Sequence, residues 1–122
     1  AGACAEATAT NTLNATPHAP PEAKMVITVL PIDSAGNWSM AADVKGLPRL
    51  AEGGYYEVWL TRGEELAASC GRCVVAENGT ASDVWLNAPY KFKNFARWVV
   101  VAQLPGKPPS ESMLDGPVVV PA

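Results

Sequence analysis

Two cysteines, Cys70 and Cys73, stand in a Cys-Gly-Arg-Cys stretch whose residue types and spacing could bind a metal or carry redox chemistry. Cys-x-x-Cys supplies half of a tetrahedral zinc site, but a structural site needs a second pair of ligands, and the other candidates are the isolated Cys4 and His18. A thioredoxin-like role needs the first cysteine at a helix N-terminus, which the surrounding β pattern does not favour. Two interpretations stay open: a disulfide that closes a tight turn or bulge, or two thiols that pack as small buried groups. We expect no metal site and no cofactor.

Acid–base catalysis has few candidate residues. The single histidine, His18, lies in a Pro-rich stretch with no ordered neighbour to fix its tautomer, so a nucleophile–histidine relay has no suitable base. Glu64 and Glu65 are adjacent, so in an extended chain they point to opposite faces and cannot flank one substrate bond. The sequence therefore predicts no catalytic residue and a protein that is not an enzyme.

Aromatic residues are the remaining candidates for a binding surface. In the expected strand over residues 54–62, Tyr56 and two aliphatic residues form one apolar face, which leaves Tyr55 and Trp59 on the mixed face. An exposed Trp-Tyr pair would suit a ligand such as a sugar. Because the flanking strands are apolar enough to cover both faces, we expect Trp59 to be mostly buried under a loop or the N-terminal segment. Three further tryptophans are expected in the core: Trp38, Trp85 and Trp98.

Length and composition favour one globular domain over residues 1–122. The chain is 48% hydrophobic and 17% charged, and its 11 Pro and 10 Gly predict frequent interruption of regular structure. A net charge of −3 without a basic cluster argues against nucleic-acid binding. No run of 18 apolar residues is present, so we expect no membrane insertion of this segment. The absence of an initiator Met suggests a processed or excised segment.

The first half of the chain reads as β-structure. Residues 1–16 are rich in Thr and Ala and favour an edge strand, with a disordered tail as the alternative, and residues 17–23 form a stiff Pro-rich connector. A hairpin is expected from strands over residues 25–32 and 37–44, joined by the turn Asp-Ser-Ala-Gly.

The second half adds further strands. Residues 66–76 are expected to be extended, and the Asn78-Gly79 dipeptide after them predicts a type I′ hairpin turn. The continuous apolar run in residues 95–104 predicts a central strand, and Gly-Pro-Val-Val-Val closes the chain as a short one. With seven or eight strands and no helical period, we predict an all-β fold, an antiparallel Greek-key (Ig-like) β-sandwich.

Several motifs give the chain a family resemblance. They are, in order, "GLP" at 46–48, "GGYYEVWL" at 53–60, "ASCG" at 68–71, "NAPY" at 87–90, "WVVV" at 98–101 and "GPVVV" at 116–120. Nearly the whole chain resembles the extracytoplasmic C-terminal domain of the anti-sigma-K factor family. The specific parts are the Gly-x-Tyr-Glu-Val-Trp-Leu block and the final Gly-Pro-Val-Val. One departure is Cys73, where the family usually has an apolar, often aromatic residue.

The resemblance implies a bacterial, non-enzymatic sensor or regulatory domain on the periplasmic or cell-surface side, tethered by a membrane helix absent from this chain. Proteolysis of the anchored protein would release a sigma factor, which binds a cytoplasmic segment with a His-xxx-Cys-xx-Cys pattern that this chain does not contain. Expected partners are membrane-associated proteases or envelope proteins. Two alternatives remain: a carbohydrate-binding or adhesion module that uses Tyr55 and Trp59, and a self-assembling structural subunit whose N-terminal strand completes a neighbour's sheet.

Overall fold

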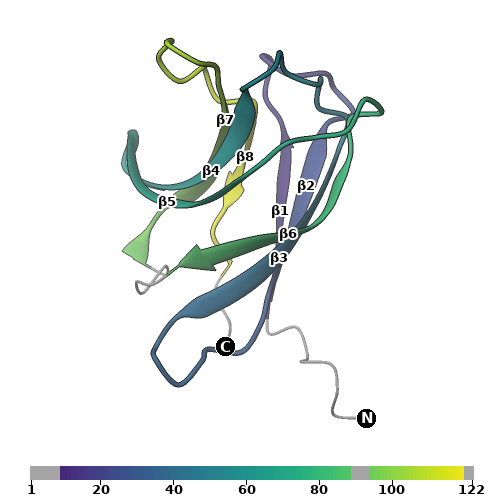
Figure 1. Ribbon diagram of the computed structural model, residues 1–122. Helices are drawn as coiled ribbons and strands as arrows, with labels where there is room; N and C mark the ends of the chain where they lie inside the picture. The colour runs from purple at the N-terminus through teal and green to yellow at the C-terminus, as the bar shows by residue number, and fades with distance from the viewer. Residues whose placement is uncertain (1–8, 89–93, 120–122) are drawn as a thin grey trace.

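Alternating apolar and polar residues organise the chain into β-strands that form one antiparallel sheet (Figure 1). The structure is a computed structural model that describes residues 9–88 and 94–119. The strand order is β5-β4-β7-β8-β1-β2-β3-β6. The predicted all-β antiparallel class is therefore confirmed. The strands are β1 (Ala9–Ala15), β2 (Lys24–Val29), β3 (Trp38–Lys45), β4 (Tyr55–Arg62), β5 (Glu65–Cys73), β6 (Ala81–Ala88), β7 (Arg97–Gln103) and β8 (Leu114–Pro117).

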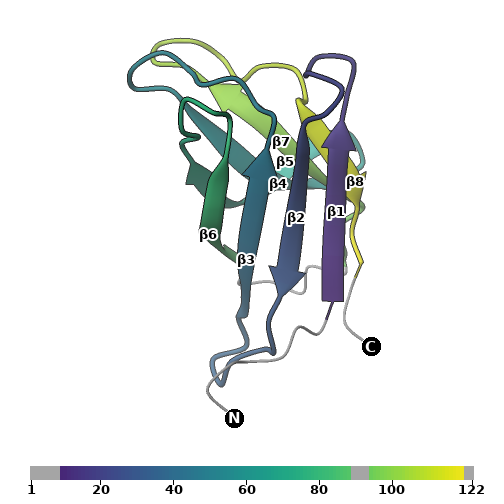
Figure 2. The same cartoon turned by 90° about the vertical axis from the view of Figure 1, so that its right-hand side faces the viewer.

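The sheet curls until it is nearly closed, like a barrel. Figure 2 shows β6, β3, β2 and β1 in front of the half formed by β4, β5, β7 and β8. On one side the halves join where β1 and β8 pair at Asn14–Asp115 and Ala15–Leu114. On the other side β5 approaches β6 at Gly71, where an added Cβ would lie 2.8 Å from Leu86 Cδ2. The interior between the halves is the core.

Every second side chain of the long strands points into this core. Trp98 on β7 is fully buried, as predicted, and Tyr56, Val58 and Leu60 form the predicted apolar face of β4. Strand β7 lies between β4 and β8, so the prediction of an interior strand is also confirmed. The buried aliphatic residues of β2 and β3 complete the core: Met25, Ile27, Val29, Met40, Ala42 and Val44.

One polar side chain, Asn11 on β1, is fully buried in this apolar interior. Its Oδ1 accepts a hydrogen bond from Trp98 Nε1 at 3.0 Å and another from the main-chain N–H of Val119. Its Nδ2 donates to the Val119 carbonyl at 3.0 Å. A buried amide is tolerated only when it is bonded in this way. Asn11 thus ties the first described strand to the chain that follows β8.

Strand β1 is not at the edge of the sheet. It pairs with β2 from Ala9 to Asn14 and with β8 at Asn14 and Ala15, whereas the edges are β5 and β6. The prediction of an edge strand or tail is therefore wrong for residues 9–15, and residues 1–8 lie outside the described chain. The reason is that β8 returns from the far end of the sequence and pairs with the C-terminal end of β1.

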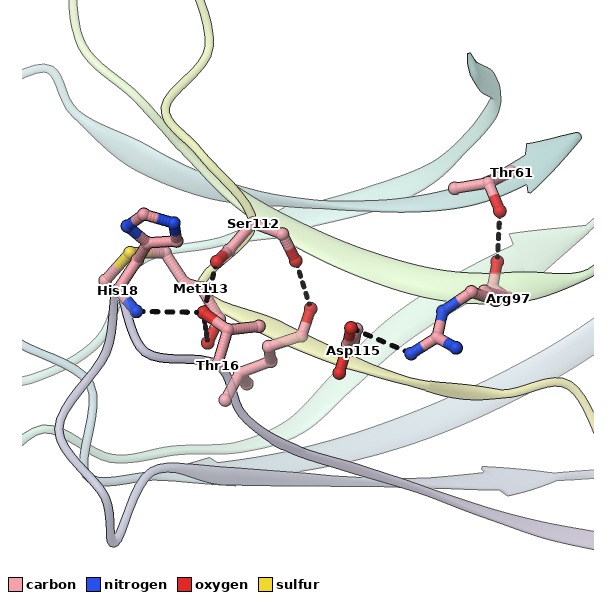
Figure 3. Close-up of polar contacts among 8 residues, drawn as sticks. Thr16, His18, Thr61, Arg97, Ser112, Met113 and Asp115 are labelled. Carbon is pink, nitrogen blue, oxygen red and sulfur yellow. Dashed lines mark hydrogen bonds and ion pairs between the residues drawn. The ribbon is translucent and has the colours of Figure 1, made fainter. Parts of the chain in front are cut away.

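Residues 17–23 form the predicted connector between β1 and β2. Just before the connector, the hydroxyl of Thr16 shares its single proton between the main-chain carbonyls of Ser112 and Met113 in the segment leading into β8 (Figure 3). The same hydroxyl accepts a hydrogen bond from the N–H of His18 at 3.1 Å. Farther along β8, Arg97 Nη2 and Asp115 Oδ2 form an ion pair at 2.8 Å. The Thr16 contacts hold the start of the connector against the segment before β8, and the ion pair joins β7 to β8.

The Asn78-Gly79 turn differs from its prediction. Gly79 has φ +81°, but Asp83 is the one described non-glycine residue with positive φ, so Asn78 does not adopt the φ of a type I′ turn. Gly79 N–H donates to Ala76 O at 2.8 Å and Ala76 N–H donates to Thr80 O at 2.9 Å. This is a three-residue loop in which a type I turn precedes a glycine bulge. The flanking strands, β5 and β6, form the two edges of the sheet, which approach each other at Gly71.

Candidate functional site

Cys70 and Cys73 both face the core, although residues three apart in a regular strand point to opposite faces. The register of β5 against β4 shifts here: Val58 is opposite Gly71 while Trp59 is opposite Ser69, so Cys70 is the extra residue of a β-bulge. The bulge turns the chain by one position and brings both thiols inward. Both are free thiols in the structure, which corresponds to the interpretation of two small buried groups.

Burial also makes these thiols chemically quiet. It raises the pKa of Cys70 to about 12 and raises the pKa of Cys73 above its usual value. The neighbouring Tyr56 has its pKa raised to about 12, mainly by burial and further by the nearby Cys73. Since the thiolate is the nucleophilic and metal-binding form, neither cysteine is poised to react. The cluster serves packing.

On the outer face of β4, Glu57 fixes the orientation of Trp59. Trp59 Nε1 donates to Glu57 Oε1 at 3.1 Å, and Ser69 Oγ donates to Glu57 Oε2 at 2.7 Å. Trp59 is half-buried, which is less than the burial predicted for it. It lies opposite Val99 on β7 and diagonal to Val101, which is 2% exposed on this outward face. Trp59 therefore packs partly over β7, and its ring is not fully exposed to solvent.

Arg72 does not pair with Glu57, the residue opposite it in the register. The Glu57 carboxylate is occupied by Trp59 and Ser69, and the Arg72 guanidinium instead stacks over the Tyr55 ring at 4.9 Å from its centroid. Within residues 9–88 and 94–119, no carboxylate forms an ion pair with Arg72. An exposed, stacked cation is thus left available to solvent.

Tyr55 and Arg72 border an open groove of about 670 Å³, which we call the Arg72 groove. One wall is the β3–β4 loop, held to the core because the Tyr56 hydroxyl donates to the Pro48 carbonyl. The loop closes with a turn in which Gly54 N–H donates to Ala51 O at 2.8 Å. The groove is lined by Arg49, Leu50, Ala51, Glu52, Gly53, Gly54, Tyr55, Arg72, Cys73 and Val74.

A second hollow of about 720 Å³ adjoins the Arg72 groove, and the two share Arg49 and Val74. Val74 is 65% exposed, the second-largest exposure among the described large apolar residues. Arg49 Nη1 lies 3.3 Å from Glu77 Oε1, and both side chains are mostly in water. Figure 1 shows the β3–β4 and β5–β6 connections that form these walls at the upper end of the molecule. Loop residues, and not strand aromatics alone, therefore shape the candidate site.

The structure places the predicted site residues near one another but in different roles. Tyr55 and Cys73 line the groove, Trp59 lies farther along β4, and Cys70 is in the core. Sequence reasoning missed Arg72 as a groove residue. The available signal was its position in Cys-Gly-Arg-Cys, because a glycine inside a strand often marks a bulge that redirects its neighbours.

Two tryptophans predicted for the core are less buried than Trp98. Trp85 on β6 is 67% exposed, whereas Trp38 at the start of β3 is half-buried and packs against the core. The prediction for Trp85 is wrong because its neighbour Leu86 takes the inward position, which leaves Trp85 on the outer face opposite Ala41. Periodicity identifies two faces but does not say which one turns inward when both carry a large apolar residue.

The remaining candidates from the sequence are a metal site, His18 and Cys4. No group of three or more His, Cys, Asp or Glu in residues 9–88 and 94–119 is arranged to hold a metal ion. His18 is exposed. Cys4 lies outside the described residues.

None of the described segments forms a helix with the length and apolar content that a bilayer span requires.

Comparisons with protein-family models, with curated proteins and with solved structures found no match to this chain.

Proposed function

We propose that this domain is a non-enzymatic recognition module, the extracytoplasmic sensor or regulatory domain of a membrane-anchored anti-sigma factor. The observation that carries the recognition role is the Arg72 groove, where a cation over the Tyr55 ring, with no ion-pair partner among the described residues, lines the same groove as the exposed Val74. The groups whose pKa is shifted, Tyr56 and the two buried thiols, are held in neutral, unreactive forms. These unreactive buried groups support the proposal that the domain acts by contact.

The regulatory part of the proposal is supported by the motif resemblance. In this function the domain binds envelope proteins or membrane-associated proteases, and its state controls whether the anchor is cut. The sigma factor is held by a cytoplasmic segment that is absent from this chain. A folded domain suits this use, because its bulk limits how closely a protease can approach the anchor beside it.

We further propose an Ig-like Greek-key path for strands β2 to β8. The support is their order: β2-β3-β6 matches the A-B-E strands of an Ig-like sheet, and β5-β4-β7-β8 matches C′-C-F-G. Strand β1 is then an addition beside the first strand of that path. The short β1–β8 ladder is where the two halves of a sandwich would join.

The alternative is a carbohydrate-binding or adhesion module. Tyr55 and Trp59, the residues predicted for this module, are poorly placed to bind a sugar. Arg72 covers the Tyr55 ring, and Glu57 accepts the hydrogen bond of the Trp59 indole N–H. The observation that favours this alternative is Trp85, exposed on the outer face of the edge strand β6. A glycan array distinguishes the two surfaces: binding lost in Trp85→Ala and kept in Trp59→Ala would favour adhesion through β6.

The regulatory proposal is tested in the cell that carries the full-length gene. Replacing residues 1–122 with an unrelated β domain of similar size should uncouple sigma-dependent transcription from its inducing condition and change the rate at which the anchor is cleaved. RNA sequencing and immunoblotting of the tagged anchor measure both. Unchanged transcription and cleavage under all conditions would contradict the regulatory function.

A further inference from the structure

We propose that the Arg72 groove binds an acidic peptide segment of a partner protein, with a carboxylate on Arg72 and an adjacent apolar side chain against Val74. This inference rests on the proposed recognition function and names the chemistry of the partner. Three observations carry it. The Arg72 charge on β5 is not paired with Glu57 on β4, the Tyr55 ring positions Arg72, and the groove lining contains more basic than acidic residues.

The first step is the unpaired charge. Arg72 and Glu57 are cross-strand neighbours, and opposite charges in such positions ordinarily pair. Here both oxygens of Glu57 accept hydrogen bonds from Trp59 and Ser69. The Arg72 guanidinium therefore keeps donors for an external acceptor. A carboxylate is the partner that matches its planar, forked geometry in two parallel hydrogen bonds.

The second step is the position of that cation. Arg72 Cζ lies over the Tyr55 ring, 4.9 Å from its centroid, within the range of a cation–π contact, and this contact occupies none of the in-plane N–H donors of the guanidinium. A side chain already held in one arrangement loses less entropy when a ligand binds. Tyr55 is itself part of the groove lining, so the stack places the charge at the groove and not on open surface.

The third step is the balance of positive and negative residues that line the groove. It contains two arginines and one glutamate, Glu52, in a chain whose net charge is −3. The second arginine, Arg49, is engaged by Glu77, but the pair is exposed. An incoming acidic residue can take over such a weak surface ion pair. Val74, 65% exposed between the two hollows, supplies an apolar contact next to both cations.

The test uses the purified chain and two fluorescein-labelled nonapeptide pools with randomised apolar flanks, one with a central Glu and one with a central Gln. Fluorescence anisotropy should show binding of the Glu pool and at least about tenfold weaker binding of the Gln pool, since a charge-assisted hydrogen bond is lost. Binding of the Glu pool should weaken with added NaCl. Absence of binding, or equal binding of both pools, would overturn the proposal.

The matched control is Arg62, which stacks on Phe95 at 5.3 Å in the same manner but lies at the other end of β4. Arg72→Ala should weaken binding of the Glu pool about tenfold or more, and Arg62→Ala should leave it unchanged. Equal loss in both variants would indicate a general charge effect and overturn the proposal. Val74→Glu, which adds a carboxylate beside the groove, should also abolish binding. Thermal melting confirms that each variant is folded, and all three positions are exposed.

Two further outcomes separate the possible failures. Binding of polygalacturonate with no peptide binding would overturn the peptide assignment. The peptide assay tests the groove alone, because it contains no sigma factor. The domain replacement described above tests the regulatory function. Peptide binding with unchanged sigma-dependent transcription would therefore support the groove and reject the regulatory function, whereas the reverse pair of results would reject the groove alone.

Discussion

Replacing Asn11 with alanine should destabilise the fold severely, although the change removes only one small side chain. Asn11 makes three hydrogen bonds, one to Trp98 and two to the main chain of Val119. At about 1 kcal/mol net for each bond, Asn11→Ala should lower the free energy of unfolding by about 3 kcal/mol. For a chain of this size that loss lowers the melting temperature by about 10 °C. The loss is a large share of the about 5–15 kcal/mol that stabilises a typical domain.

Urea denaturation followed by tryptophan fluorescence measures this loss, and a control on the same strand isolates its cause. Asn14 also lies on β1 but is exposed, so Asn14→Ala should change stability by less than about 0.5 kcal/mol. A double-mutant cycle with Trp98→Phe should give a coupling of about 1 kcal/mol, because the indole N–H bonds to Asn11 Oδ1. A loss in Asn11→Ala below about 1 kcal/mol would refute the view that this amide ties β1 to the segment after β8.

Three other predictions concern stability. Gly116→Ala should cost about 2 kcal/mol in urea denaturation, because an added Cβ collides with a carbonyl of β1, and unchanged stability would mean that β8 sits farther from β1. Burial raises the pKa of Cys70 from 9.0 and of Tyr56 from 10.0 to about 12 in each case, so the unfolded chain loses these protons first. Stability present below pH 9 should therefore fall as pH rises toward 12, seen as a falling urea midpoint, and a flat profile would contradict the burial. Trp85→Ala should change the free energy of unfolding by less than about 0.5 kcal/mol, whereas Trp98→Ala should cost about 3–5 kcal/mol, and similar losses would contradict their different burial.

The fold class could be predicted because alternation is a local property. The inward residues of β4, Tyr56, Val58 and Leu60, are visible as a two-residue period, and the same holds for β2 and β3. The partners of a strand are not local. Strand β1 contains polar residues in the pattern of an edge, and only the return of β8 from about 100 residues away makes it an inner strand. The buried Asn11 has no signature in its own segment, because its partners lie far along the chain.

The candidate site was predicted only in part for a related reason. Tyr55 and Cys73 could be placed on β4 and β5 from the sequence, but the bulge at Cys70 decides which way Cys73 and Arg72 point. A bulge moves every later side chain of a strand to the other face, and no count of residues reveals it. The Arg72 groove also needs the β3–β4 loop, whose position depends on the hydrogen bond from Tyr56 to Pro48.

The position of β1 also decides how the domain responds to tension. Strand β1 begins at Ala9, at the end of the molecule opposite the Arg72 groove (Figure 1), and forms six register pairs with β2. A pull on the chain ahead of Ala9, resisted by a partner in the groove, runs along β1 and loads these pairs together in shear. A pull between that chain and the chain after Pro117, which leave from the same end, parts strands one pair at a time. Single-molecule pulling in the two geometries should give the higher rupture force in the first. A partner bound in the groove would therefore let the domain resist a larger force applied to the chain ahead of Ala9.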